Sequence, residues 1–594
     1  MRHLRKTSPS HATSTLAVLT LLGTLTACSM LGANAAAAAS PPSHDPHQTG
    51  VVLDSSATSS SAAGTSQTTG SNSSNSSGGS TGSTGSTGSK GTGVPKGLES
   101  FYNQDLTWTD CTDDATGTAF QCATVTVPLD YDNPQGQTIT VALKKLPSTS
   151  PSPQGSVFLN PGGPGGSGIS LIESNAELYK SGDLSEVLAN YDVIGFDPRG
   201  VGQSTPITCW TPEDVQAILA GQAEMPSYLT AGSAADIVAQ GSREATACQE
   251  HTEVPEILDH ADTRSVARDM DVMRALVGDK DLNYLGYSYG TYLGAVYTEL
   301  FLDNIGRVVL DSAMDPTMNR QEAMEGDAAA AEQALRTYIE SQQGQAGFPL
   351  SGTTDESVAQ LAAFLDGLDA NPLTVSDSVT PLDRTKTVNA IGKLVNSSPD
   401  KWPLLNEGLA QAMNAHDGTA LAKSAASLSG NSAPPPTTEK QVVEQLRGLK
   451  AFSANRCLDF PDTGNEASWD TALASYRHDY PVFHSALPQT DAFCHGWGHT
   501  SKTKAVDVDV EATNPMLVIG ILHDPNTPYP WSQALVSRIR NSHLLSVDIY
   551  GHGATGRNAC TSAKVSDFLV NGTLPSNGEV CAADPEPGAE GEKD

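Results

Sequence analysis

Gly286-Tyr287-Ser288-Tyr289-Gly290 is the stretch that decides how this sequence is interpreted. It follows a short apolar run, Leu282–Leu285, and precedes a segment of helical character, Thr291–Leu300. A serine between glycines, placed between a strand and a helix, is typical of a nucleophile elbow, in which a sharp turn exposes the hydroxyl above a sheet. A glycine-rich serine loop is also a common ordinary turn. With these flanks, the pattern predicts that Ser288 is a nucleophile.

Two further residues complete the pattern that an activated serine requires. A serine hydroxyl needs a positioned base, and in this architecture the acid and the histidine follow the serine in chain order. Asp524 comes just after the apolar run Pro515–Leu522, and His552 lies between two glycines after the run His543–Ile549. We predict that His552 takes the proton from Ser288 and that Asp524 fixes the imidazole. Weaker candidates, which do not follow the last strand or lie inside a strand-like run, are His495, His499, His523 and Asp548.

The glycine-rich segment Asn160–Gly166 supplies the expected site for a negatively charged oxygen. The backbone N–H of Gly163, or of Gly162, is one expected donor, and the N–H of Tyr289 is the second. The alternative is a phosphate-binding loop. That alternative requires a Gly-Lys-Ser/Thr ending, and the segment has none.

Short apolar runs alternate with helix-like segments over most of the chain. Val266, Met270, Met273 and Val277, for example, recur at helical spacing. The alternation predicts an α/β fold with a mostly parallel central sheet flanked by helices. The turn Asp197-Pro198-Arg199-Gly200 is expected to be structural, with Asp197 and Arg199 paired to each other. The predicted strands contain Ser156–Asn160, Tyr191–Phe196, Leu282–Leu285, Arg307–Leu310, Pro515–Leu522 and His543–Ile549.

Residues 315–510 differ from the rest, because they are rich in Ala, Gln, Glu and Ser and contain few strand-like runs. Glu322–Glu340 predicts one long helix, and Pro434–Pro436 breaks the segment. We expect a helical cap inserted over the carboxyl ends of the strands, where open α/β sheets bind ligands. The predicted organisation is a signal peptide (1–27), a disordered tether (28–97), the first part of the core (98–314), the cap (315–510), the second part of the core (511–582) and an acidic tail (583–594).

The net charge limits the range of partners. Lys and Arg number 34 and Asp and Glu number 67, so the charge is 34 − 67 = −33. Binding nucleic acid takes many Lys and Arg residues, so nucleic acid is excluded as the expected partner. An electrostatic anchor on anionic lipid is disfavoured for the same reason.

The N-terminal segment predicts export. Positive residues precede an apolar stretch, Leu16–Leu25, which is too short for a transmembrane span. It ends in Leu25-Thr26-Ala27-Cys28, which resembles a bacterial lipobox and predicts a lipidated Cys28 on the outer face of the membrane. The alternative is cleavage near Ala33–Ala39, which would give a soluble secreted protein. The tether, rich in Ser, Gly and Thr, is expected to span roughly 40 Å as a flexible coil.

The cysteine count agrees with export. Apart from Cys28 there are eight, an even number that suggests disulfides in an exported chain. Eight cysteines allow 105 pairings, and we expect pairs of sequence neighbours. A metal site is a poor alternative, because C-x-x-C spacing is absent from the sequence, and no cofactor is expected. The predicted pairs are Cys111–Cys122, Cys209–Cys248, Cys457–Cys494 and Cys560–Cys581.

Several of these motifs together resemble the α/β-hydrolase peptidases of the prolyl iminopeptidase and tripeptidyl aminopeptidase family. The cysteines near both ends of the body are similar to those of its secreted actinobacterial branch with a TAP-like C-terminal region. The resemblance implies an exopeptidase that acts on peptides with a free N-terminus. Pro161 stands where prolyl iminopeptidases have His, which points to the tripeptidyl branch. The motifs are NPGGPGGSG at Asn160–Gly168, DPRGVGQS at Asp197–Ser204, GYSYG at Gly286–Gly290, DPNTP at Asp524–Pro528 and GHG at Gly551–Gly553.

Rival functions remain at this point. A carboxylesterase or lipase uses the same three residues, and a surface binding lipoprotein could keep the fold without activity. A dehalogenase or epoxide hydrolase normally has Asp at the elbow, so Ser288 speaks against both. An aminopeptidase must also bind a charged amine, and the carboxylates that are candidates by location alone are Glu322, Glu325, Asp327 and Asp459.

Overall fold

The computed structural model describes residues 94–584, apart from 114, 227–228, 230–231, 377–380, 429–435, 461–462, 485–488 and 501–506. The predictions for the signal peptide, for Cys28 and for nearly all of the tether and the acidic tail lie outside the described residues, as do Pro434 and Pro435. Among the helices that are described, none is long and apolar enough to cross a membrane.

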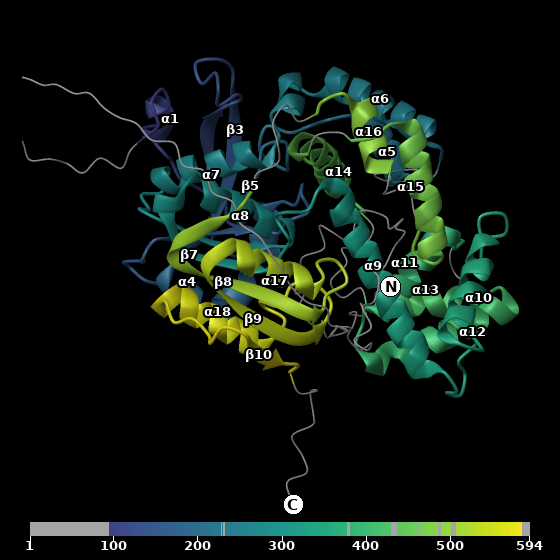
Figure 1. Cartoon of the computed structure of the whole chain (residues 1–594). Coiled ribbons are helices and arrows are strands. Elements are labelled where there is room, and N and C mark those ends of the chain that lie inside the picture. The colour runs from purple at the N-terminus through teal and green to yellow at the C-terminus, as the bar shows by residue number, and fades with distance from the viewer. Residues whose placement is uncertain are drawn as a thin grey trace, which may run out of the picture.

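A single mixed sheet organises the described chain, with its strands in the order β1-β2-β3-β5-β4-β6-β7-β8-β9-β10 (Figure 1). β1, β2, β3 and β5 pair antiparallel, and every pair from β5 to β10 is parallel. The predicted mostly parallel sheet is therefore confirmed. The strands are β1 (Thr109–Asp110), β2 (Gln121–Pro128), β3 (Thr138–Leu146), β4 (Ser156–Asn160), β5 (Asp192–Asp197), β6 (Leu282–Tyr287), β7 (Ile305–Asp311), β8 (Val510–His523), β9 (Ile539–Tyr550) and β10 (Glu579–Ala582).

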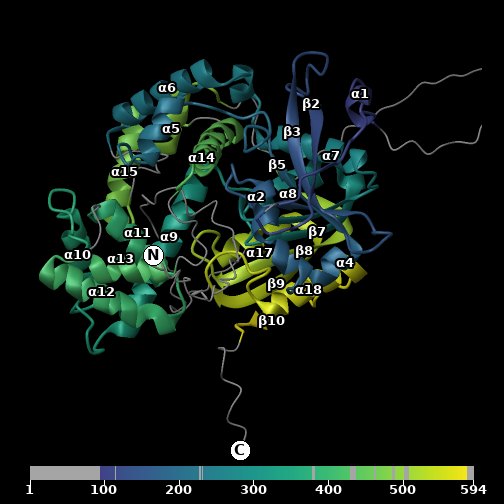
Figure 2. The same ribbon diagram turned by 180° about the vertical axis from the view of Figure 1, so that it is seen from behind.

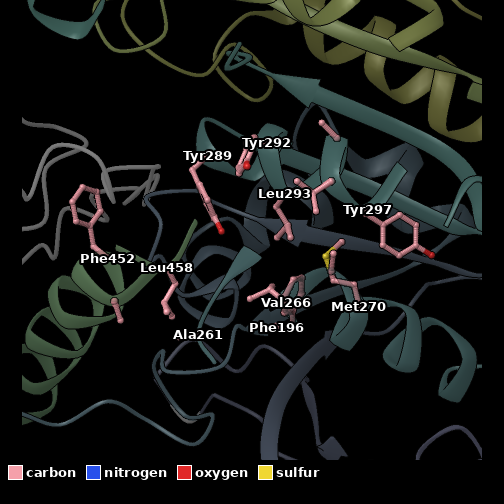
Figure 3. Packing of buried hydrophobic residues seen from close by; sticks show 14 of the residues in the cluster. Phe196, Ala261, Val266, Met270, Tyr289, Tyr292, Leu293, Tyr297, Phe452 and Leu458 are labelled. Carbon is pink, nitrogen blue, oxygen red and sulfur yellow. The ribbon is translucent and has the colours of Figure 1, made fainter. Parts of the chain in front are cut away.

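Helices cover both faces of this sheet, which explains why its central strands are apolar throughout. Successive side chains of a strand point to opposite faces. Phe158 packs with α7 and α8, whereas Val157 and Leu159 pack with α2, α4 and α18. Figure 3 shows part of the first cluster, with Val266 and Met270 of α7 beside Leu293 and Tyr297 of α8. These and the other core helices are α1 (Glu99–Tyr102), α2 (Gly168–Ser174), α3 (Ala176–Lys180), α4 (Ser185–Asn190), η1 (Pro255–Asp259), α7 (Thr263–Leu276), α8 (Tyr289–Leu300), η2 (Leu302–Asn304), α17 (Tyr529–Arg538) and α18 (Ala559–Asn571).

The segment between β7 and β8 is helical, as predicted, and it has two parts. The outer part, α10–α13, buries its apolar residues with α9 in a cluster of its own. The inner part, α14–α16, packs into the same cluster as the sheet. In Figures 1 and 2, α10, α12 and α13 lie away from the sheet, whereas α14 lies close to it. The helices are α9 (Arg320–Gln342), α10 (Thr354–Asp366), α11 (Arg384–Val395), η3 (Pro399–Lys401), α12 (Trp402–Ala415), α13 (Thr419–Ser427), α14 (Glu439–Asp459), α15 (Glu466–Asp479) and α16 (Thr490–Trp497).

Two helices from the first part of the predicted core join this insertion. α5 (Pro212–Leu219) packs against α14 through Val215 and Val442. α6 (Ala234–His251) packs so closely on α16 that a Cβ at Gly241 would lie 2.2 Å from the carbonyl oxygen of Phe493. The predicted domain boundaries stay a prediction, and α5 and α6 lie with the helical insertion in space.

Disulfides join the four predicted pairs of cysteines, Cys111–Cys122, Cys209–Cys248, Cys457–Cys494 and Cys560–Cys581. Cys457–Cys494 links α14 to α16, and Cys209–Cys248 ties the segment before α5 to α6. Two of the four bridges thus stabilise the layer of helices next to the sheet. Disulfides persist in oxidising compartments, so these bridges fit an exported protein.

Candidate active site

Ser288 lies at the turn between β6 and α8, as the sequence predicts. It has a left-handed φ of 57° and a ψ of −127°, and it is 4% exposed. A non-glycine residue in this region is strained by about 1–3 kcal/mol. Its N–H donates to the carbonyl oxygen of Asp311 (2.9 Å), and its carbonyl accepts from the N–H (2.8 Å) and hydroxyl (2.6 Å) of Thr291. These three bonds hold the strained turn in place.

The two glycines of the pentapeptide are required by close packing. A Cβ at Gly286 would lie 2.5 Å from the carbonyl oxygen of Gly290. A Cβ at Gly290 would lie 2.9 Å from both the carbonyl and the side-chain oxygen of Asn160. Neither glycine has a positive φ. The two glycines are therefore needed because β4, β6 and α8 pack closely together here, and not because the backbone is left-handed.

Asp524 and His552 meet at the carboxyl ends of β8 and β9. The Nδ1 atom of His552 lies 2.9 and 3.0 Å from the two carboxylate oxygens of Asp524. Asp524 is fully buried and also accepts the N–H of Asn526 (2.9 Å) and the N–H (3.0 Å) and hydroxyl (2.9 Å) of Thr527. Burial raises the pKa of Asp524, but His552 and these donors together hold it below the usual value. An ionised Asp524 can therefore orient the ring with Nε2 directed away from it.

The competing residues are engaged elsewhere. His523 pairs through Nε2 with Asp548 (3.1 Å) and stacks on Tyr550 with ring centroids 4.2 Å apart. His499 contacts Asp259 (3.0 Å), and the ring of His495 lies 5.7 Å from that of Trp469. Two candidate pairs are therefore in contact. The side chains of His523 and Asp548 are 41% and 55% exposed, whereas those of His552 and Asp524 are 11% and 0% exposed, so the buried pair is the one that the sequence predicts.

The segment of residues 160–166, called the oxyanion loop after its predicted role, lies directly on the elbow. A Cβ at Gly162 would lie 2.9 Å from both the Cβ of Ser288 and the backbone N of Tyr289. The N–H of Gly162 donates to Oδ1 of Asn160 (2.9 Å). Gly163 stays the first predicted oxyanion donor.

Helix α14 fixes the other side of this loop. A Cβ at Gly165 would lie 2.2 Å from the carbonyl oxygen of Gly448. Further along α14, Nδ2 of Asn455 donates to the hydroxyl of Tyr289 (2.9 Å), which also hydrogen-bonds to Thr263. The cap thus contacts both predicted oxyanion elements.

The three candidate amine-binding carboxylates whose side chains the structure describes, Glu322, Glu325 and Asp459, make separate contacts. Glu322 completes the capping box of α9, accepting the N–H of Asn319 (2.8 Å), and Glu325 accepts from Gln321 (2.8 Å). The side chain of Asp327 lies outside the described residues. Asp459 accepts the N–H (2.8 Å) and hydroxyl (2.6 Å) of Thr263, and burial raises its pKa to about 7. Its bonds support Tyr289 through Thr263.

The predicted pairing of Asp197 with Arg199 is wrong. The buried guanidinium of Arg199 instead pairs with Asp269 of α7 (2.7 and 2.8 Å). Asp197 accepts the N–H of Ile169 (3.3 Å) and Gln203 (2.7 Å). The two side chains are directed to different neighbours because the turn after β5 lies between the start of α2 and α7. The turn is structural, as expected.

Comparisons with known proteins identify the family. The models described as alpha/beta hydrolase fold and as TAP-like protein match residues 155–372 and 480–581. A tripeptidyl aminopeptidase of Streptomyces lividans is 32% identical over 498 residues, covering 81% of this chain and 88% of that protein. The chain belongs to the tripeptidyl aminopeptidase family of α/β-hydrolases. Serine protease Hip1 of Mycobacterium tuberculosis is 28% identical over 77% of the chain and 87% of that protein. Carboxylesterase B of the same species is 31% identical over 78% and 86%.

This member of the tripeptidyl aminopeptidase family is thus a serine hydrolase related to peptidases. Three residues around this candidate site have no separate role predicted from the sequence: Asn160, Asn455 and Asp311. Asn160 and Asp311 are the last residues of β4 and β7. Polar residues that end parallel strands meet at one edge of the sheet, and this signal would have found both. Asn455 lies in the middle of α14, and nothing in the local sequence indicates its contact with Tyr289.

Proposed function

We propose that the protein is an exported serine exopeptidase that hydrolyses peptide bonds near the free N-terminus of a peptide. The contact between Asp524 and His552, at the sheet edge that carries Ser288, is the observation that best supports this proposal. The related tripeptidyl aminopeptidase and serine protease support the choice of peptide as substrate.

In the proposed mechanism His552 accepts the proton of Ser288 while the hydroxyl oxygen attacks the scissile carbonyl carbon. The N–H groups of Gly163 and Tyr289 stabilise the resulting oxyanion, and losing one such donor typically costs about 2.7–4 kcal/mol. Protonated His552 then donates its proton to the leaving amine. Water, activated by the same imidazole, hydrolyses the acyl-enzyme and releases the N-terminal fragment.

A substrate panel tests the class of reaction. We compare tripeptidyl-arylamides with a free and with an acetylated N-terminus, together with short-chain p-nitrophenyl esters. The proposal expects hydrolysis of the free arylamide, little hydrolysis of the acetylated one, and activity that is lost in Ser288→Ala by up to about 10⁶-fold. Turnover of the ester without the arylamides would instead favour a carboxylesterase, the function named for one relative. Inactivity on all three substrates would favour a surface binding protein.

A second prediction concerns the acid limb of the pH–rate profile, which is the decrease in rate at low pH. A general base must be unprotonated, and the ordinary histidine pKa is about 6.5. We therefore expect kcat/KM for the free arylamide to fall as the pH decreases below about 6.5. A rate that stays constant down to pH 4 would contradict the role of His552.

We also propose that residues 1–27 are removed and that Cys28 carries the lipid that attaches the protein to the outer face of the membrane. The lipid would be its only contact with the membrane. Its partner would be a substrate peptide with a free N-terminus, and no nucleic acid would be bound. The mass of the mature N-terminus tests this: a lipidated chain starting at Cys28 is expected, and an unmodified chain starting near Ser40 would identify a soluble secreted protein.

A further inference from the structure

Asp311, the last residue of β7, contacts the two chain segments that carry Ser288 and His552. Its carbonyl oxygen accepts the N–H of Ser288 (2.9 Å). Its carboxylate accepts the N–H of Ala554 (3.1 and 3.2 Å) and the N–H of Thr555 (2.7 Å), which lie in the loop just after His552. Asp311 is fully buried. Asp311 therefore joins the elbow, through its backbone carbonyl, to the loop of residues 551–555, the His552 loop, through its carboxylate.

The next residue extends this arrangement to the strand that precedes Asp524. The hydroxyl of Ser312 accepts the N–H of Gly553 (2.8 Å), and its own N–H donates to the carbonyl of Ile519 in β8 (3.0 Å). Asp311 and Ser312 together therefore join the three segments that carry Ser288, Asp524 and His552. The groups that Asp311 and Ser312 bind in these segments are backbone N–H and carbonyl groups, so the contacts fix the position of each segment.

Arg557 also holds the His552 loop, through backbone carbonyl groups rather than N–H groups. The guanidinium of Arg557 donates to the carbonyls of Tyr550 (3.2 Å), His552 (2.8 Å) and Gly553 (3.1 Å). Asp311 binds N–H groups of the loop, whereas Arg557 binds its carbonyls. Burial raises the pKa of Asp311, whereas the N–H donors of Ala554 and Thr555 and nearby His552 lower it. Arg557 and Tyr287 are further charged or titratable groups that interact with Asp311.

We propose that Asp311 is a positioning residue for the reaction: it holds the His552 loop against the nucleophile elbow, and its negative charge stabilises the protonated His552 formed during attack. The inference rests on the proposed function, because it assumes that His552 is the base. The carboxylate of Asp524 orients the imidazole, and that of Asp311 places the backbone that carries it. The two aspartates therefore have separate and testable roles.

Asp311→Asn tests the proposal with little change of shape. The amide keeps one acceptor oxygen but turns an NH₂ toward a backbone N–H, and it removes the charge. We expect kcat for the free tripeptidyl-arylamide to fall about 10- to 100-fold, because a hydrogen bond to a charged group is broken, with KM changed less than about twofold. Removing a carboxylate near His552 disfavours its protonated form. The acid limb of kcat/KM should therefore move to lower pH, a shift that a purely structural defect does not cause.

Asp279→Asn is the matched control. Asp279 also accepts a backbone N–H, that of Ser156 (2.9 Å), but at the opposite end of β4 from Asn160. This variant should keep the wild-type kcat and acid limb. An Asp311→Asn enzyme with the kcat and acid limb of the control would overturn the proposal. Covalent labelling of Ser288 by a fluorophosphonate in the wild type distinguishes that result from a failure of the proposed function.

Ser312→Ala keeps the test decisive if Asp311→Asn does not fold. This variant removes the partner of the Gly553 N–H without a change of charge. We expect kcat to fall about three- to tenfold, as for the loss of one neutral hydrogen bond, with an unchanged acid limb. A wild-type kcat in Ser312→Ala would show that the contacts at the end of β7, those of Asp311 and Ser312, do not position the His552 loop for the reaction.

Discussion

The inner and the outer part of the helical insertion relate to the sheet in different ways. The inner part, α14–α16, shares a hydrophobic cluster with the sheet and contacts the oxyanion loop through Gly448 and Tyr289 through Asn455. The outer part, α10–α13, has a separate cluster and reaches the core through Trp402, whose ring lies 6.3 Å from that of Tyr550. A cap can therefore combine a helix that contacts the predicted oxyanion elements with a lobe for which, among the described residues, no such contact is found. Matched substitutions in the two parts test this difference.

The largest effect is expected where α14 contacts the oxyanion loop. In Gly165→Ala the new Cβ would lie 2.2 Å from the carbonyl oxygen of Gly448, and φ is +92°. The loop must move, so kcat/KM should fall about 10²–10³-fold, the loss typical of one oxyanion donor. Gly344→Ala, next to the outer part, carries the same kind of backbone strain at φ +78° with nothing within 4 Å. Equal activities of the two variants would refute a special role for the contact with α14.

Truncation of one apolar side chain in each part separates stability from activity. Phe452 on α14 and Leu405 on α12 are both buried, in the sheet cluster and in the outer cluster respectively. Phe452→Ala and Leu405→Ala should each lower the free energy of unfolding by about 2–5 kcal/mol, as measured with denaturant. Only Phe452→Ala should slow fluorophosphonate labelling, by roughly tenfold or 1.4 kcal/mol. Equal slowing in both would mean that the outer part also supports the site.

A smaller effect is expected from a pair of asparagines that each contact a buried tyrosine hydroxyl. Asn455 donates to Tyr289 (2.9 Å) in the inner part, and Asn406 accepts from Tyr338 (2.6 Å) at the outer cluster. Both alanine variants should lose about 1–3 kcal/mol of stability. Asn455→Ala should also lower kcat about three- to tenfold, because Tyr289 supplies the proposed oxyanion N–H. The arylamide assay checks this, and a lowered kcat in Asn406→Ala would argue against the distinction.

The smallest effect concerns the pH dependence of stability. Burial raises the pKa of Asp459 from an ordinary value of about 3.9 to about 7. The folded state therefore holds more protons than the unfolded state between these values, and this contribution to stability is lost as the pH rises from about 4 to about 7. Asp459→Asn should remove that loss, so its free energy of unfolding should decrease less over this range. Asp355→Asn, at an exposed side chain of α10, should match the wild type; Asp459→Asn matching it as well would contradict the prediction.

Much of the fold and part of the candidate site could be predicted because the signals are local. Each predicted strand is an apolar run, and Ser288, Asp524 and His552 each follow such a run in an order that the architecture fixes. The neighbour pairs of cysteines were predicted correctly for the same reason.

What could not be predicted depends on contacts between distant segments. Arg199 is followed 70 residues later by its partner Asp269. Asp311 and Ala554 are separated by 243 residues. No pattern within a strand or a helix encodes such pairs, because the segments meet only in the folded arrangement of the sheet and the cap. The attachment of α5 and α6 to the insertion was missed for the same reason.

The most direct test of the central claim is a mass-spectrometric map of the site modified by a fluorophosphonate. The wild-type protein should gain one adduct, on the peptide that contains Ser288, and Ser288→Ala should gain none under the same conditions. An adduct on another serine, or equal labelling of Ser288→Ala, would contradict the assignment of Ser288 as the nucleophile.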